Sequence, residues 1–210
     1  MVSKNKYKLG KKTLSALLLS AALAFGSVTP SKAASGSAEV MGGTGAITMD
    51  VKLTEKPTPY TIFFFRDRIS VDYVGQPSHS ALADLRIPLV GGLLGLVEGT
   101  ATQTITPRLG LAYSQKNDNC SGYGALTYGL GAQNGMLFLT GNCSFPLGNL
   151  RLMISGENIT VFNAGGHLQS TQRLRTGFTY GPAFFGPALD LTEKDDKIDY
   201  NLGAALGIRF

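Results

Sequence analysis

Histidine is the side chain best suited to proton transfer near neutral pH, and the chain contains two histidines. One lies in Ser78-His79-Ser80, with Asp84 a few residues further on, and the other is His167, three residues before Ser170. A serine activated by a histidine is the arrangement used for acyl transfer and hydrolysis. Neither segment matches a catalytic motif, and histidines beside serines also occur in ordinary polar loops. A catalytic pair and a plain polar loop therefore both stay open.

Other kinds of catalytic or binding chemistry need spacings that the chain lacks. The sequence has no glycine-rich phosphate loop, no metal-ligand spacing and no nucleophile elbow. We therefore expect no cofactor and no metal ion.

A larger set of charged side chains alternates with apolar ones along the chain. It comprises Arg66, Arg68, Arg86, Arg108, Arg151, Arg173, Arg175 and Arg209, with Asp50, Asp72, Asp84, Glu98, Glu157 and Asp199. A period of two places such residues on one face of β-strands, so both signs of charge converge on one surface. If the strands close into a barrel, that surface is the lumen. It would hold either a structural network of paired charges or a narrow pore whose slight excess of arginine favours anions.

The clearest strand pattern occupies the last thirteen residues, from Ile198 to Phe210. The even positions are all apolar: Ile198, Tyr200, Leu202, Ala204, Leu206, Ile208 and Phe210. The odd positions are small, polar or charged, and include Asp199, Asn201 and Arg209. No helix would sort the residues in this way, and the length suits a tilted strand that crosses a bilayer with about 9–11 residues. We expect the even set to face lipid and the polar odd residues to face the lumen or its rim.

The aromatic end, Phe210, preceded in register by Ile208, Leu206 and Tyr200, resembles the terminal strand of bacterial outer-membrane β-barrel proteins. The small members of this class are the OmpA, OmpX and OmpW type. In that family the strand is the assembly signal read by the barrel-assembly machinery. The resemblance implies an integral barrel in the outer membrane of a Gram-negative-type bacterium, with that machinery, membrane lipid and lipopolysaccharide as partners. It identifies a class of protein and no particular activity.

The amino-terminus predicts export. A basic region (Lys4 to Lys12), an apolar core (Leu14 to Phe25) and the small-x-small site Ser31-Lys32-Ala33 make up a signal peptide over residues 1–33. This leader holds six of the nineteen Lys and Arg residues and none of the fourteen acidic ones, which leaves thirteen against fourteen. The remaining basic residues form no cluster interleaved with aromatics, so we expect no nucleic-acid partner. The mature chain, 34–210, is one domain by length.

The two cysteines flank a predicted hairpin. Asn134-Gly135 is a strong turn sequence because both residues tolerate positive φ. Folding the chain about Gly131 to Asn134 brings Cys120 opposite Cys143. Two thiols alone make a poor metal site, so in an exported protein we expect a disulfide between them.

Nine segments of the mature chain alternate as strands do. They are 47–53, 60–74, 81–90, 100–114, 123–133, 136–145, 150–157, 172–184 and 198–210. Residues 34–45 are interpreted as a lead-in with little order, 91–99 are left unassigned, and 190–197 are interpreted as an acidic loop. Single-chain bacterial barrels have an even number of strands. Either the segment with Pro88 is not a strand, or the run up to Ser114 divides at Pro107. We predict an all-β, closed antiparallel transmembrane barrel of eight strands, with ten as the alternative.

Three functions remain open from the sequence. The leading hypothesis is an integral outer-membrane barrel with an envelope structural or surface-interaction role and weak pore activity, without enzymatic activity. The second is a lipid A-modifying enzyme that uses one of the two histidine segments. The third is a soluble exported barrel of the lipocalin type, which would need an apolar interior and a polar outer face, the reverse of the observed alternation.

Overall fold

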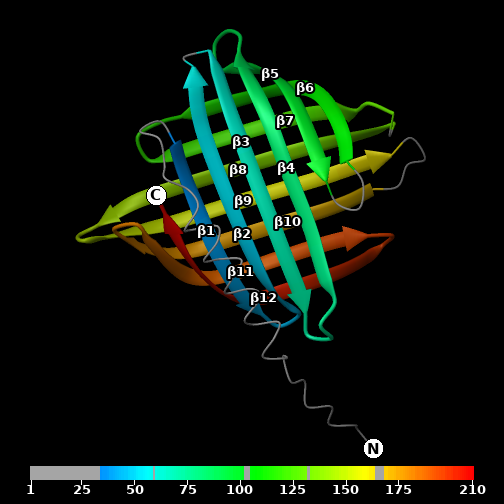
Figure 1. Ribbon diagram of the computed structural model, residues 1–210. Helices are drawn as coiled ribbons and strands as arrows, with labels where there is room; N and C mark the ends of the chain where they lie inside the picture. Colours follow the sequence, from blue (N-terminus) through cyan, green and yellow to red (C-terminus); the bar gives the residue numbers. More distant parts are fainter. Residues whose placement is uncertain (1–33, 59, 102–104, 132, 164–167) are drawn as a thin grey trace, which may run out of the picture.

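The computed structural model describes residues 34–58, 60–101, 105–131, 133–163 and 168–210, which form twelve antiparallel strands (Figure 1). The first six are β1 (Ala34–Gly43), β2 (Ala46–Thr58), β3 (Thr61–Asp72), β4 (Pro77–Pro88), β5 (Leu93–Ala101) and β6 (Ile105–Lys116). The others are β7 (Cys120–Gly129), β8 (Asn134–Leu147), β9 (Leu150–Asn163), β10 (Leu168–Tyr180), β11 (Ala183–Lys194) and β12 (Lys197–Arg209). Within the described ranges, no helix is long and apolar enough to cross a membrane.

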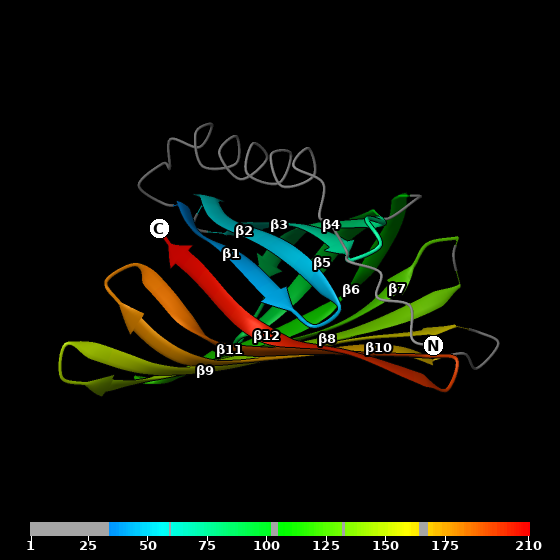
Figure 2. The ribbon, with the colours of Figure 1, turned by 90° about the horizontal axis from the view of Figure 1, so that it is seen from below.

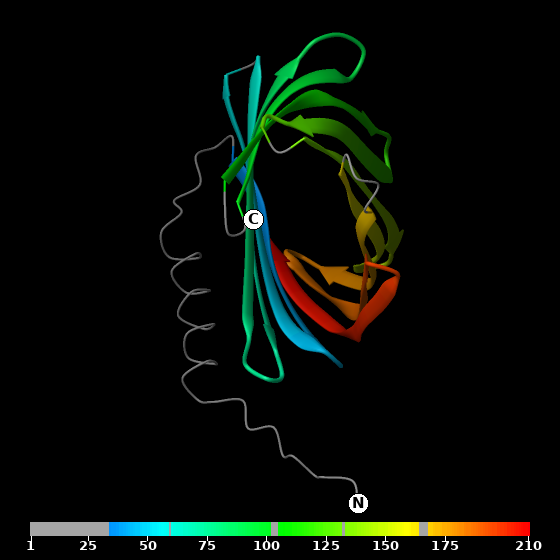
Figure 3. The same cartoon turned by 90° about the vertical axis from the view of Figure 1, so that its right-hand side faces the viewer.

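The strands form one closed barrel in which each strand pairs with its neighbours in sequence and β12 pairs with β1. Figures 2 and 3 show the closure, with the red β12 beside the blue β1. At the seam, Gly36 and Phe210 exchange two backbone hydrogen bonds of 2.7 and 3.0 Å. We call the end of the barrel that carries Gly36 and Phe210 the termini rim, and the opposite end the far rim.

The prediction of eight strands is wrong, and so is the alternative of ten. The nine predicted segments correspond to nine of the twelve strands, and the other three are β1, β5 and β11. Because the diameter of a barrel grows with its strand number, twelve strands enclose a wider lumen than the predicted eight would.

Strand β1 was expected to be a lead-in because its sequence, ASGSAEVMGG, has small residues where an apolar face would show. It is held on both sides: Ser37 pairs with Arg209 of β12 and with Lys52 of β2. Without β1, both neighbours would be open edges with unpaired N–H and C=O groups. Closure therefore selects this segment as a strand despite its weak pattern.

Strand β5 shows no alternation because both of its faces carry apolar residues. Leu94 and Leu96 are buried in the lumen, whereas Val97 is exposed on the outer wall. The run up to Ser114 does divide, but between Ala101 and Ile105. Pro107, the predicted point of division, lies inside β6 opposite Gly99.

Strand β11 was hidden because the predicted segment 172–184 continues through a tight turn. Tyr180 pairs with Ala183 across Gly181, whose φ of 56° suits glycine. The predicted acidic loop is mostly strand, and its turn consists of Asp195 and Asp196 with φ of 50° and 59°. Aspartate is among the residues that tolerate this left-handed conformation, so two acidic residues can make a hairpin turn.

Candidate functional site: the barrel lumen

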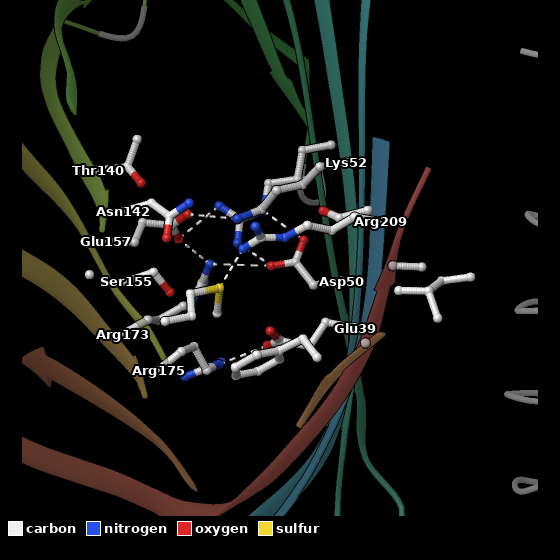
Figure 4. A pocket seen from close by; sticks show the side chains of 18 residues that line it. Glu39, Asp50, Lys52, Thr140, Asn142, Ser155, Glu157, Arg173, Arg175 and Arg209 are labelled. Atoms are coloured by element: carbon white, nitrogen blue, oxygen red, sulfur yellow. Dashed lines mark hydrogen bonds and ion pairs between the residues drawn. The ribbon is translucent and has the colours of Figure 1, made fainter. Parts of the chain in front are cut away.

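Strand alternation delivers a dense set of charged side chains into the lumen. We call the larger group the cross-lumen network; it consists of Glu39, Asp50, Lys52, Arg66, Arg68, Glu157, Arg173, Arg175 and Asp190. Its members come from β1–β3 on one wall and from β9–β11 on the other. Figure 4 shows Glu157 and Arg173 pointing across the lumen toward Asp50 and Lys52.

Glu157 is the centre of this network. Its Oε1 accepts a hydrogen bond of 2.8 Å from Arg66 Nη1 and a second bond from Arg173 Nη1, and Lys52 Nζ lies 3.2 Å from its Oε2. Arg66 belongs to β3 and Glu157 to β9, which are six strands apart in either direction around the barrel. This pair therefore bridges diametrically opposite walls.

The arginines of the network are buried or half-buried, and three of the four, Arg66, Arg173 and Arg175, each contact two carboxylates. Arg66 donates from Nε to Asp50 Oδ1 at 2.9 Å and also from Nη2 to Asp50 Oδ2. Arg175 donates to Glu39 and Asp190, both at 2.7 Å, and Arg68 donates to Asp190 at 2.7 Å. Charges buried in this way need such partners, since removal of one member costs about 3–5 kcal/mol.

A second and smaller charged group, the β4–β6 cluster, consists of Asp84, Arg86, Glu98 and Arg108. Arg86 donates two hydrogen bonds, of 2.7 and 2.9 Å, to the Asp84 carboxylate. Its guanidinium lies 4.3 Å from the centre of the Tyr123 ring. Arg108 Nε lies 3.8 Å from Glu98 Oε1. The first pair lies within β4 and the second joins the neighbouring strands β5 and β6, so neither pair spans the lumen.

Apolar side chains fill the rest of the lumen, which the sequence pattern did not predict. One cluster contains Leu94, Leu96, Ala112, Ala125 and Phe138, against which Tyr123 and Ile159 pack. The other contains Met41, Met153, Phe184, Ala188 and Ala205. The sequence does contain a signal for these clusters, because apolar residues such as Leu94 and Leu96 occupy positions that alternation assigns to the lumen.

A cavity of about 200 Å³ lies in the network, toward the termini rim (Figure 4). Five cationic side chains, from Lys52, Arg66, Arg173, Arg175 and Arg209, and three carboxylates, from Glu39, Asp50 and Glu157, line it. Arg209 contacts the Met153 sulfur, and no carboxylate of the described residues lies within 4.0 Å of it. The cavity wall therefore carries two positive charges in excess.

Not all the predicted lumen charges join these groups. The structure brings together Arg66, Arg68, Glu157, Arg173 and Arg175 in the network and places Arg108 in the β4–β6 cluster. Asp72 instead caps the next turn by accepting from the backbone N–H groups of Val74 and Gln76. Arg151 binds Ser144, and Asp199 lies at the exposed start of β12.

The residues of the predicted assembly signal lie on the outer wall. Tyr200, Leu206, Ile208 and Phe210 are between 39 and 67% exposed, as their even positions require. Asn201, on the other parity, accepts hydrogen bonds from the backbone N–H groups of Gly45 and Ala46 and so holds the β1–β2 turn.

The pleat separates the residues of the first histidine candidate. His79 points outward and lies 2.6 Å from Asp67 Oδ1, which explains why Asp67 interrupts the apolar face of β3. Asp84 points into the lumen and binds Arg86, and Ser78 and Ser80 share its parity. His79 therefore has a carboxylate partner but no adjacent serine in line with it.

Of the second histidine candidate, the structure describes Ser170. His167 lies outside the described residues. Ser170 is buried on the outer wall, where its hydroxyl is hydrogen-bonded to Asn158 and Thr160 at 3.2 and 3.3 Å.

The two cysteines lie directly opposite each other in the register of β7 and β8. Their Cα atoms are 4.1 Å apart, and the structure joins them in a disulfide. Strand β7 ends at Gly129 and β8 begins at Asn134, so the predicted turn residues Asn134 and Gly135 instead lie in β8. The bond lies near the termini rim.

No protein-family model matches the chain, and no curated protein matches it. Among solved structures, the chain is similar to the KdgM porin, with 8% identity, 84% of this chain and 98% of that chain covered, and a TM-score of 0.47. It is also similar to a bacterial polysaccharide outer membrane secretin (11% identity, 85% and 97% covered, TM-score 0.38) and to a mutant of the Rh. blastica porin (8%, 84% and 99%, TM-score 0.30). The neighbours are outer-membrane barrels, and none singles out the OmpA, OmpX and OmpW group. The closed wall of this barrel is shown by the strand pairing described above.

Proposed function

We propose that the protein is an integral outer-membrane barrel whose lumen is a narrow channel that prefers anions. The observation that carries the proposal is the excess of two positive charges around the 200 Å³ cavity. Charged rings in a pore select ions of the opposite sign, and arginine keeps its charge at any physiological pH. Two buried guanidinium nitrogens, Arg68 Nη1 and Arg173 Nε, also have no hydrogen-bond partner within the described part of the chain.

The outer wall supports the membrane location. Large apolar side chains such as Leu126, Leu174 and Leu206 are 49–64% exposed there, which water would disfavour and lipid would not. Outward aromatic residues also gather near the two rims. Phe63, Phe145, Phe178, Phe185 and Phe210 lie toward the termini rim, and Tyr73, Tyr128, Phe162 and Tyr200 toward the far rim. Such paired girdles mark the two interfaces of a bilayer, and a lipocalin-type barrel would have a polar outer wall in their place.

The proposed location in the outer membrane implies a route of export and assembly. Residues 1–33 are removed on export, the assembly machinery reads the strand that ends at Phe210, and the folded barrel contacts membrane lipid and lipopolysaccharide. Mass spectrometry of the membrane-embedded protein tests the first step. We expect the mass of a chain that begins at Ala34. Folded protein that still carries residues 1–33 would refute the proposed cleavage.

A second candidate, a closed barrel with an envelope structural role, is favoured by the bridge between Arg66 and Glu157. These side chains cross the whole lumen and hold opposite walls together. A lumen closed in this way would stabilise the barrel without conducting ions.

Planar-bilayer recordings of the refolded barrel distinguish the two candidates. We expect small conductance steps and a reversal potential, in a KCl gradient, that shows preference for chloride. Glu157→Gln removes one carboxylate from the cavity and should strengthen that preference. Glu98→Gln in the β4–β6 cluster is the matched control and should leave it unchanged. A cation-selective channel would contradict the proposal, and a correctly folded but silent barrel would favour the structural role.

A further inference from the structure

The outer wall of the barrel carries a groove of about 910 Å³ that crosses β6 to β11. Volumes of about 300–1,000 Å³ are typical of sites for small ligands. The groove lies outside the lumen because its apolar lining, including Leu139 and Leu174, is on the exposed parity. The neighbours Glu157 and Arg173 turn their side chains inward, into the cross-lumen network.

Glycines form the floor of this outer-wall groove. Gly122 of β7 pairs with Gly141 of β8, which in turn pairs with Gly156 of β9. A Cβ atom added at any of the three would approach no atom closer than 3.9 Å, and none of them has a left-handed φ. By contrast, a Cβ at Gly203 would overlap the backbone of Gly42, so that glycine is needed by the barrel itself.

The glycine row therefore has no cause within the wall. Glycine weakens a strand interior, and where no turn or bulge needs it, it marks a place where another molecule approaches the backbone closely. Three such residues in register keep the wall thin along one line.

The sides and one end of the groove indicate what fits. Leu139, Leu174, Leu189, Leu191 and Tyr113 supply an apolar lining. At the end toward the far rim, Asn158 and Gln172 pair directly and place two amides on the outer wall. These amides begin a polar patch that continues to Thr160 and Ser170 and separates Leu174 from Phe162 of the far-rim girdle.

We propose that the outer-wall groove holds one lipid of the surrounding bilayer, an inference that rests on the proposed membrane location. Its hydrocarbon chain lies along the glycine row, and its ester or hydroxyl oxygens accept hydrogen bonds from the amides of Asn158 and Gln172. The charged residues of the lining pair inside the lumen, so the polar part is recognised by hydrogen bonds and not by charge. A second copy of the barrel would present a convex wall and would touch only the sides of the groove.

Native mass spectrometry of the barrel, refolded with phosphatidylethanolamine and released from detergent, tests this proposal. We expect the unmodified barrel to retain one phosphatidylethanolamine. Gly141→Leu and Gly156→Leu fill the groove and should lower the retained fraction about tenfold. Asn158→Ala with Gln172→Ala should lower it less, because the chain still fits. Gly99→Leu is the matched control, since Gly99 also faces outward with nothing within 4 Å of an added Cβ but lies outside the groove.

Heat-modifiable gel mobility and bilayer conductance of the same samples keep the outcomes separate. Loss of lipid with normal mobility and unchanged conductance supports the site, whether or not the barrel is selective for anions. A barrel that retains no lipid, or one in which Gly141→Leu and Gly99→Leu behave alike, overturns it. A dimer that disappears in Gly141→Leu would also overturn it, by assigning the groove to a second copy.

Discussion

The two halves of the lumen arise from the same alternation of inward and outward residues but are held together differently. In the cross-lumen network, side chains reach between strands up to six apart, as Arg66 and Glu157 do. In the first of the two apolar clusters, Leu94, Leu96 and Phe138 pack with residues of the consecutive strands β5 to β8. Ion pairs therefore fix the separation of opposite walls and surround the charged cavity, whereas the packing around Leu94, Leu96 and Phe138 fixes the local curvature of one wall.

The largest effect is expected from loss of a bridge in the charged half. Arg66→Ala deprives Asp50 and Glu157 of one of the two guanidinium groups that they share, the other being that of Arg173, and should lower the free energy of unfolding by about 3–5 kcal/mol. It also removes one of the two excess positive charges, so chloride preference should fall. Urea unfolding in lipid vesicles and reversal potentials measure the two effects. An unfolding free energy within 1 kcal/mol of the unmodified value would show that the bridge does not hold the walls.

The β7–β8 hairpin, which belongs to the apolar half, is tied by the disulfide. Replacement of Cys120 and Cys143 by serine should lower the free energy of unfolding by about 3 kcal/mol for a loop of this length. Ion selectivity should not change, because the bond lies on the outer wall. Unfolding under reducing and non-reducing conditions measures this effect. Two free thiols in the unreduced denatured protein would show that the disulfide does not form.

A truncation inside the apolar cluster should cost somewhat less. Leu96→Ala removes a buried side chain of 3% exposure, and we expect a loss near the lower end of the usual range, about 2–3 kcal/mol, because Tyr123 and Ile159 can move into the space. The reversal potential should stay unchanged. A shift in selectivity as large as that of Arg66→Ala would mean that ions pass through the apolar half.

The sequence predicted the closed barrel class because outward positions are apolar almost throughout, as in β12. It also nominated Arg66, Arg68, Glu157, Arg173 and Arg175, because charges stand out among apolar neighbours. It could not supply the number of strands. Closure imposes β1 through pairing, and two-residue turns such as Asp195-Asp196 leave little trace between strands.

The contacts among the side chains inside the lumen could not be predicted from the sequence either. Which arginine meets which carboxylate depends on strands far apart in the chain, such as β3 and β9. Alternation reports only which face a residue takes. The apolar half was not predicted for a different reason. Strands are predicted from the contrast between an apolar and a polar face, and Leu94 and Leu96 remove that contrast in β5.

The smallest effect on stability, and the sharpest test of the charged half, is expected from Arg209→Gln. Arg209 lines the cavity without a carboxylate of the described residues within 4.0 Å, so its removal leaves no buried anion unpaired and should change the free energy of unfolding by less than about 1 kcal/mol. Chloride preference should nevertheless fall, because one of the two excess charges is lost, just as in Arg66→Ala. Reversal potentials of the two variants are therefore expected to agree while their stabilities differ. If Arg209→Gln leaves the reversal potential untouched, the selectivity does not come from the net charge of this cavity, and the two halves of the lumen differ in stability alone.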